Sequence, residues 1–196
     1  MHNSKVVSHS KYLDFKSTKA DSGSLWFYVK RNNDSTDHDS AVVITTLVKI
    51  KNKYNFLFLK TKRPPMTAEK KANYCLECPA GLIGDENKKE NLEVCLKKEL
   101  LEETGLKADE IFVEAKNISS SCGLTSETLT FVTAIVKEEV FYSRPESDGG
   151  VILDRIYVPY YDIESSINSL SDLGYSVSGA LICGVYFAKN RFRDEL

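Results

Sequence analysis

The amino-acid sequence predicts an α/β sandwich with one domain, preceded by a small β-rich extension. Runs of β-branched and aromatic residues, typical of strands, are mixed with helical segments between residues 41 and 192. At 196 residues and 42% hydrophobic, the chain is long enough to bury a core in a single domain. We therefore divide it into an N-terminal extension over 1–40 and a main domain over 41–196.

Strands account for most of the expected elements. The extension is polar, and most of it reads as turns or loops, except for "SLWFYVKR" (24–31), which we expect to form a strand. In the main domain, the expected strands cover 41–50, 54–61, 74–78, 111–118, 128–140 and 151–159. The first two are separated only by "KNK" and predict a hairpin.

Helices and loops complete the pattern. Pro64 and Pro65 predict a loop over 62–73, because proline cannot donate a hydrogen bond inside a central strand. The longest helical pattern covers about 88–103 and ends before Gly105. Two further helices are expected, at about 160–170 and 178–192, the second apolar on most sides and packed on the sheet.

Composition and charge exclude several classes of protein. The net charge of −2 and the pI near 6.0 give no electrostatic basis for binding nucleic acid or an anionic membrane. No segment approaches the roughly 20 apolar residues of a membrane span, and the N-terminus lacks the apolar region of a signal peptide. Five cysteines, an odd number, favour reduced thiols and a cytoplasmic location.

Histidine is confined to the extension, at His2, His9 and His38. A Ser/His/Asp or Cys/His catalytic group in the main domain is therefore not expected, nor is a histidine-rich transition-metal site. Any chemistry in the main domain must use carboxylates, hydroxyls, backbone groups and a hard cation.

The helix expected at 88–103 places acids on its apolar side. At about 100° per residue, Glu99, Glu102 and Glu103 fall in the sector that the leucines and Cys95 turn toward the core. Like charges three and four residues apart repel each other, so we expect a cation there. Oxygen ligands favour Mg²⁺ or Mn²⁺, and such a site suits hydrolysis of a phosphoanhydride.

The segment 84–106, "GDENKKENLEVCLKKELLEETGL", resembles the Nudix box. The family pattern has glycine, five residues, glutamate, seven residues, Arg-Glu, an aliphatic residue, any residue, Glu-Glu, any residue, glycine and an aliphatic residue. The matching positions are Gly84, Glu90, Glu99, Leu100, Glu102, Glu103, Gly105 and Leu106. Lys98 stands where the family usually has arginine, and lysine cannot reproduce a bidentate pair with a neighbouring glutamate.

Three other segments resemble the ADP-ribose pyrophosphatase and nucleoside-diphosphate-sugar hydrolase branch of this superfamily. They are "ECPAGLIGDE" (77–86), "KRPPM" (62–66) and the strand 24–31. The resemblance implies a Nudix α/β/α sandwich with a mixed sheet, Mg²⁺ dependence with Mn²⁺ as the alternative, and a nucleotide-sugar substrate. Cleavage of its pyrophosphate would give a nucleoside monophosphate and a sugar phosphate. The resemblance also implies a homodimer in which the extension (1–40) contributes to dimerisation and substrate contacts.

Residue roles follow position by position from the resemblance. It implies that Glu99 and Glu103 are the principal metal ligands, with the Ala80 carbonyl as another. Glu102 is implied to be a further ligand or a group that orients water, so Glu102 and Glu103 are catalytic candidates. The implied substrate contacts are Arg31 and Arg63 at the diphosphate or terminal sugar, Trp26 at the base with Tyr12 as a candidate partner, and Ser121 and Glu127 in the loop 120–127.

The chain departs from the branch in two places. Gly81 precedes the box glycine Gly84 by three residues, whereas in this branch one glycine usually serves both motifs. Val151 occupies the position near which related enzymes often carry a glutamate, proposed as a base or an extra metal ligand. Glu146 and Asp148 lie just upstream, and either is a candidate replacement.

The leading hypothesis is Mg²⁺-dependent hydrolysis of ADP-ribose or a related nucleoside-diphosphate sugar. UDP-glucose is the alternative substrate, because the motifs do not separate adenine from uracil recognition. A second alternative is a non-catalytic nucleotide-binding Nudix scaffold, for which Lys98 and Val151 are the supporting residues.

Overall fold

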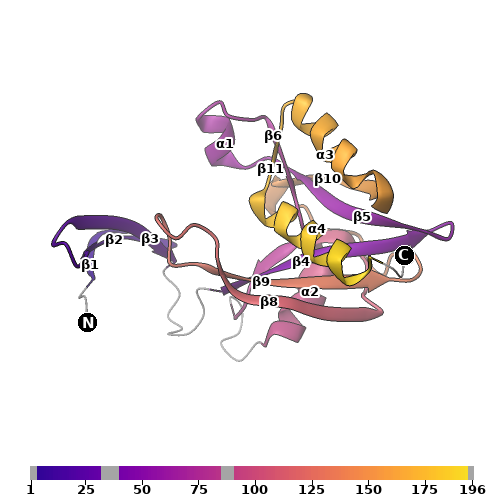
Figure 1. Cartoon of the computed structure of the whole chain (residues 1–196), viewed down its shortest axis with the longest axis horizontal. Coiled ribbons are helices and arrows are strands. Elements are labelled where there is room, and N and C mark those ends of the chain that lie inside the picture. Colours follow the sequence, from indigo (N-terminus) through magenta and orange to yellow (C-terminus); the bar gives the residue numbers. More distant parts are fainter. Residues whose placement is uncertain (1–3, 32–39, 85–90, 194–196) are drawn as a thin grey trace.

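The computed structural model describes residues 4–31, 40–84 and 91–193, and these form two β-sheets with helices around the larger one (Figure 1). The smaller sheet contains three antiparallel strands, β1 (Lys5–His9), β2 (Leu13–Lys19) and β3 (Leu25–Arg31). It projects from one end of the molecule, beside the connection between two strands of the main sheet (Figure 1). The expected β-rich extension is therefore present.

The main sheet is mixed, as expected, and its central strand is β4 (Ser40–Ile50). β4 runs parallel to β9 (Thr128–Val136) and antiparallel to β5 (Lys53–Thr61), with which it forms the predicted hairpin. The remaining strands are β6 (Tyr74–Glu77), β7 (Ala80–Leu82), β8 (Glu110–Ser119), β10 (Ile152–Pro159) and β11 (Tyr175–Val177). Their order is β11-β6-β5-β4-β9-β8, with β10 paired to β5 and β7 paired to β4.

The central strand changes partner along its length, which positions the candidate site. Residues 46–50 of β4 pair with β5, whereas residues 41–43 pair with β7. Beyond this point β5 pairs with β6 in place of β4, while β10 pairs with residues 55–61 of β5. The two halves of the sheet therefore diverge at the N-terminal half of β4.

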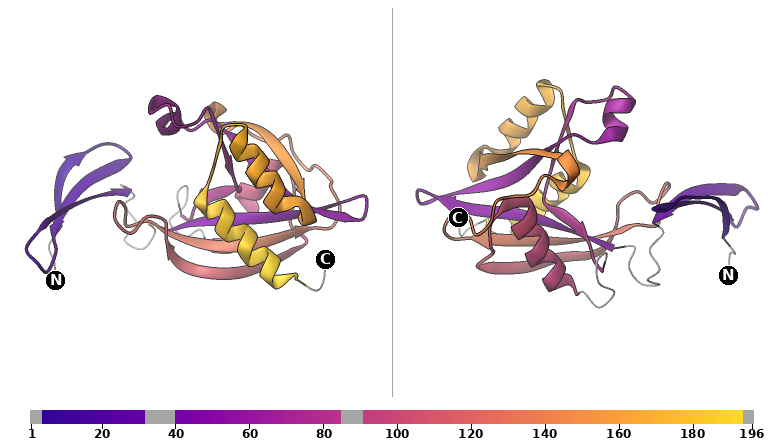
Figure 2. Two further views of the ribbon diagram at one scale, coloured as in Figure 1. Left: turned by 45° about the horizontal axis from the view of Figure 1, so that its top comes forward. Right: turned by 180° about the vertical axis from the view of Figure 1, so that it is seen from behind.

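Helices cover both faces of the sheet (Figure 2). α2 (Leu92–Thr104) lies on one face, and α3 (Ile163–Asp172) and α4 (Gly179–Arg191) lie on the other. Because both faces are covered, every residue from Val42 to Val48 is buried. This confirms the predicted α/β arrangement with helices on each side of a mixed sheet.

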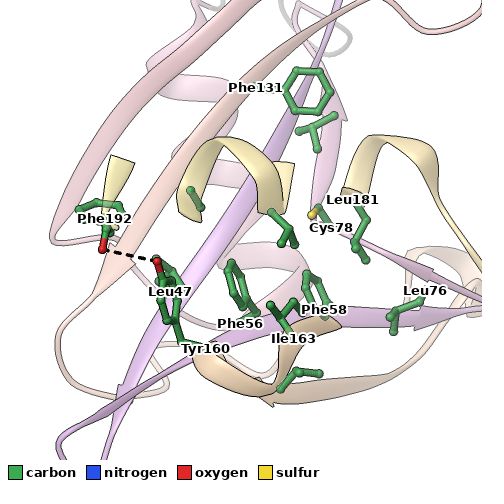
Figure 3. Packing of buried hydrophobic residues seen from close by; sticks show 14 of the residues in the cluster. Leu47, Phe56, Phe58, Leu76, Cys78, Phe131, Tyr160, Ile163, Leu181 and Phe192 are labelled. Atoms are coloured by element: carbon green, nitrogen blue, oxygen red, sulfur yellow. Dashed lines mark hydrogen bonds between the residues drawn. The ribbon is translucent and has the colours of Figure 1, made fainter. Parts of the chain in front are cut away.

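Side-chain alternation along the strands divides the core into two layers. Val43 and Leu47 of β4 pack with α3 and α4, whereas Val42 and Ile44 pack with α2. Figure 3 shows the first layer, which is rich in aromatic residues. Its labelled members include Leu47, Phe56, Phe58, Leu76, Phe131, Tyr160, Ile163, Leu181 and Phe192. Burial of each such side chain contributes about 1.5–3 kcal/mol to folding.

The predicted loop over 62–73 is wrong in part, because it contains the one-turn helix α1 (Pro64–Ala68). Proline is tolerated in the first turn of a helix, where its missing N–H has no helical partner to lose. α2 begins at Leu92 rather than near 88, since the Asn91 side chain caps it by accepting a 3.0 Å hydrogen bond from the Val94 N–H. The predicted strand 128–140 ends at Val136, and β1, β2, β7 and β11 were not predicted.

Short helical turns also occur at Asp148–Gly150 and Tyr160–Asp162. In the part of the chain that the structure describes, none of the helices combines the length and the apolar character needed to cross a membrane.

Candidate active site

Glu103 lies in the last turn of α2, where the sequence predicts a metal ligand. Its carboxylate accepts a 3.0 Å hydrogen bond from the backbone N–H of Ala80. The pKa of the Glu103 carboxyl is raised from its ordinary 4.5 to about 8, chiefly by burial and also by the charges of Glu99 and Asp148, whereas the Ala80 N–H and Arg63 act in the opposite direction. A carboxyl in this environment favours either a bound proton or a nearby cation.

Glu99 lies one turn before Glu103 on α2 and packs against β7. A Cβ atom on Gly81 would overlap with the Glu99 carboxylate, so a larger residue at this position would displace the Glu99 side chain. Lys98 Nζ lies 3.7 Å from Glu99 Oε1. The lysine thus lies near a neighbouring glutamate, but at a longer distance than a good hydrogen bond.

Two arginines approach these acids from other elements. Arg63, immediately before α1, donates from Nε to Glu77 Oε2 at 2.8 Å, and Thr61 donates to the same oxygen at 2.7 Å. Arg31, at the end of β3, donates from Nε to Glu127 Oε1 at 2.9 Å. Because a guanidinium has five N–H donors, one carboxylate contact through Nε leaves donors for an anionic ligand.

One cavity of about 760 Å³ joins the acidic and the basic residues. It lies where β7 replaces β5 beside β4, and the N-terminal turn of α4 also contributes to its wall. Its volume is in the range typical of sites for small molecules and cofactors. The predicted site residues that line it are Arg31, Arg63, Ala80, Glu99, Glu103, Glu127 and Asp148.

Two predicted acids do not line this cavity, namely Glu102 and Glu146. Leu100 and Thr104 are buried on α2, which moves the centre of the buried stripe away from Glu102. Glu146 instead uses its backbone: its N–H donates to the Glu102 carbonyl at 2.7 Å. Of the two candidate loop acids, the structure therefore brings Asp148 to the cavity.

Trp26 and Ser121 also lie outside the cavity lining. The Trp26 ring is half exposed, and its Nε1–H donates to the Gly123 carbonyl at 3.1 Å. Ser121 belongs to the same loop and accepts backbone hydrogen bonds from Leu124 and Thr125. Their substrate contacts stay predictions, as does the suggestion that Tyr12, which is 70% exposed, is a partner of Trp26.

The donor chemistry of the cavity fits a divalent cation, because the carboxylates of Glu99, Glu103 and Asp148 are close enough for their charges to interact. Within residues 4–31, 40–84 and 91–193, no three His, Cys, Asp or Glu side chains are arranged as a preformed metal cluster. Ala80 lines the cavity, and its N–H is directed to Glu103. The metal ligands thus remain predictions, and the box residue Glu90 lies outside the described residues.

Two residues of this region were not among the predicted site residues. Glu77 lines the cavity and holds Arg63, and its place in the "ECPAG" segment was the available signal. Arg155, on β10, donates from Nε to the Glu103 carbonyl at 2.8 Å and from Nη2 to the Glu146 carbonyl at 3.2 Å. No local sequence pattern indicated Arg155, because its partners are backbone atoms far away in the chain.

Comparisons with known proteins agree with the motif and the fold. The chain is 27% identical over 173 residues to the ADP-sugar pyrophosphatase of Mus musculus, covering 84% of this chain and 75% of the mouse protein. A crystal structure of an ADP compounds hydrolase matches with a TM-score of 0.62 and 18% identity, over 97% of this chain and 92% of the other. No family model matches the sequence.

A second solved structure, the NUDIX domain of Shewanella oneidensis NrtR complexed with ADP ribose, matches with a TM-score of 0.52 and 17% identity. The match covers 78% of this chain and 87% of the other. The fold is therefore that of a NUDIX domain. Taken with the box at 84–106, the likeness to the mouse protein agrees with the resemblance to the ADP-ribose pyrophosphatase branch of the Nudix superfamily.

Proposed function

We propose that this protein hydrolyses the pyrophosphate bond of ADP-ribose or a closely related ADP-sugar, giving AMP and a sugar phosphate. Support comes from the mouse relative, whose name is ADP-sugar pyrophosphatase, and from the similarly folded ADP compounds hydrolase. The similarly folded NUDIX domain complexed with ADP ribose supports the same ligand class. UDP-glucose stays the alternative substrate.

The observation that carries the proposal is the distribution of charge in the cavity. Glu99, Glu103 and Asp148 line it together with Arg31 and Arg63. A diphosphate is an anion that guanidinium groups bind well, and acids beside it suit a phosphate-bound cation. A cavity lined by basic residues alone would favour binding, whereas the added carboxylates favour catalysis.

Glu99 and Glu103, with Ala80, would hold Mg²⁺ or Mn²⁺, which when bound neutralises developing charge on the phosphates. Arg63, fixed by Glu77, and Arg31, fixed by Glu127, would orient the diphosphate within the cavity. Asp148 lines the cavity and would accept a proton from the attacking water. The water oxygen bonds to phosphorus as the bridging P–O bond breaks.

The proposed functional unit is a homodimer assembled through the N-terminal sheet. One face of that sheet presents Leu13, Phe15, Leu25 and Phe27, which are 41–56% exposed. Phe15 and Phe27 stack on each other with ring centroids 5.4 Å apart. An exposed cluster of large apolar side chains on a small sheet supports a partner surface.

Product analysis tests the proposed function. Purified protein is incubated with ADP-ribose, ADP-glucose, UDP-glucose or NADH, with and without Mg²⁺, and the released nucleotides are separated by chromatography. We expect AMP from ADP-ribose only when metal is present, with Glu103→Gln as the inactive control. UMP from UDP-glucose would replace the substrate but keep the reaction. Binding of ADP-ribose without cleavage would support the non-catalytic scaffold.

A further inference from the structure

Arg155 on β10 connects two parts of the candidate active site that are distant in sequence. Its Nε and Nη2 groups both donate to the carbonyl of Glu103, at 2.8 Å from Nε. The same Nη2 donates to the carbonyl of Glu146 at 3.2 Å. One planar guanidinium thus joins the last turn of α2 to the loop that carries Asp148, two residues after Glu146.

The surrounding contacts show how much of the helix end depends on this loop. The last carbonyls of a helix have no partner within the helix. Here the Glu146 N–H donates to the Glu102 carbonyl at 2.7 Å, and Ser143 Oγ donates at 3.3 Å to the Leu101 carbonyl, which also accepts the Gly105 N–H. Arg155 supplies the donors for the next carbonyl in the series, that of Glu103. The loop and Arg155 together complete the C-terminal end of α2.

The chemistry of arginine is matched to this position. A guanidinium offers several donors in one plane, so it can bind two carbonyl oxygens at once, whereas a lysine ammonium is a single point charge. Its positive charge also lies at the negative end of the helix dipole. Burial lowers the pKa of Arg155, and Asp154 and Glu103 act in the opposite direction. A cation is kept partly buried here despite the desolvation cost.

We infer that Arg155 is a positioning residue that fixes Glu103 and Asp148 relative to each other across the cavity. This inference rests on the proposed function, since it assigns Arg155 to the alignment of that reaction. Arg155 contacts backbone atoms of both segments and acts on the reacting groups only through them. Arg155, on β10, is distinct from Lys98 of the box, which lies on α2. Lys98 Nζ is 3.7 Å from Glu99, and a lysine cannot form a bidentate pair.

The test compares Arg155→Lys with Arg191→Lys. Arg191 is a suitable control because it donates from Nε and Nη2 to the two oxygens of Glu114, at 2.7 and 2.9 Å, and neither residue lines the cavity. For Arg155→Lys we expect kcat on ADP-ribose to fall about 10- to 100-fold, with KM changed less than about 3-fold. Arg191→Lys should leave both constants within about 2-fold of wild type, because neither member of this ion pair lines the cavity.

A second measurement is independent of turnover. In metal-free protein, amide hydrogen exchange of residues 141–148 and 101–105 should be faster in Arg155→Lys than in wild type, and unchanged there in Arg191→Lys. Assays are run well below both melting temperatures, so that a general loss of stability does not lower kcat. Arg155→Met, which keeps the buried stem without a charge to desolvate, replaces the lysine variant if that variant does not fold.

Unchanged kcat and unchanged exchange in a folded Arg155 variant would overturn the inference, as would a change in KM alone. A wild-type protein that cleaves no nucleotide sugar would disprove the proposed function instead. Faster exchange in the two segments would in that case still support the link that Arg155 makes between them.

Discussion

Glu103 shows how the requirements of folding and of the proposed chemistry conflict at one residue. Its pKa in the folded protein is raised to about 8, chiefly by burial, above the ordinary 4.5. The folded state therefore binds the proton more tightly than the unfolded state. The stability that this contributes is complete below about pH 4.5 and is lost as the pH rises through 8. Near neutral pH the ionised carboxylate is a destabilising group, which is common where a charge serves function.

Replacing Glu103 with glutamine should therefore stabilise the metal-free protein and inactivate it. The amide keeps the shape of the side chain and can accept the Ala80 N–H, but it carries no charge to desolvate. We expect the free energy of unfolding at pH 7.5 to rise by about 1–3 kcal/mol and turnover to fall at least about 100-fold. Thermal melts with chelator between pH 5 and 8.5 should show the wild type losing stability relative to the variant as pH rises. A variant that melts in parallel with wild type would contradict the raised pKa.

Asp148 and Glu146 can be separated by matched amide substitutions. Asp148 lines the cavity, whereas Glu146 contacts the end of α2 and Arg155 through backbone atoms. Asp148→Asn should lower kcat by about 10²- to 10⁴-fold, the range typical of general base catalysis, and Glu146→Gln should change it less than about 3-fold. Steady-state kinetics on ADP-ribose measures both. A large loss of kcat in the Glu146 variant alone would show that Glu146, and not Asp148, is the general base.

Among single residues, the sequence predicts that Glu99 and Glu103 lie on one face of the helix, because helical periodicity and the box spacing agree. The same periodicity predicts that Glu102 also faces inward, but Glu102 lies at the margin of the buried stripe. In the structure that stripe continues along α2 through Leu100 and Thr104. The position of Arg155 beside the site could not be predicted, because a guanidinium that binds backbone carbonyls leaves no pattern in the local sequence. Its role depends on the pairing of β10 with β5, which brings it to the end of α2.

Among the elements, α4 packs tightly on the sheet at Gly184. A Cβ atom there would overlap with Thr45 Oγ1, so the helix can cross β4 at this distance only with glycine. The Thr45 hydroxyl is buried and lies 4.0 Å from Cys78 Sγ, which leaves it little room to move. This contact sets the distance between α4 and the sheet next to the cavity.

Gly184→Ala should therefore destabilise the protein by about 1–3 kcal/mol, the usual cost of overpacking a core. Gly179→Ala in the first turn of the same helix is the matched control, because no heavy atom lies within 4 Å of the added Cβ. The control should be neutral or stabilising by up to about 1 kcal/mol, as expected from helix propensity. Urea denaturation of both variants measures the difference. Equal stabilities would show that the helix can shift outward at little cost.

The long elements were predictable because their burial is uniform. β4, β5 and β9 are apolar runs in the middle of a sheet covered on both faces, and such runs stand out in any sequence. β7 and β11 have only three residues each, too few to show a period. β1 is exposed at every position, and α1 begins with two prolines, which indicate a loop as readily as a first helical turn.

For the whole molecule, the N-terminal sheet completes the cavity rather than forming an independent unit. Its last strand contacts the loop 120–127 through a 2.8 Å hydrogen bond from the Val29 N–H to the Leu124 carbonyl. Arg31, at the end of that strand, reaches the cavity and pairs with Glu127. The position of the sheet therefore decides where a candidate diphosphate ligand lies. A partner that holds the sheet in place would stabilise the site as well.

Measuring the oligomeric state tests whether the site depends on a partner that holds the N-terminal sheet in place. Leu25 is 56% exposed on the apolar face of the N-terminal sheet, and its cross-strand neighbour is Lys19. Leu25→Asp should be tolerated within one chain, because an acid opposite a lysine is a favourable pair, but it should oppose burial against a second copy. Leu173→Asp, at the end of α3 and 76% exposed, is the matched control.

We expect light scattering after gel filtration to show a dimer for wild type and for Leu173→Asp, and a shift toward monomer for Leu25→Asp. A stable interface of this kind buries about 800 Å² per partner, so one buried charge should weaken it strongly. Activity should fall with the monomer fraction, because Arg31 would then lie on a sheet that is held through its contacts with the loop 120–127. A wild-type monomer with full activity would show that this loop suffices to position Arg31.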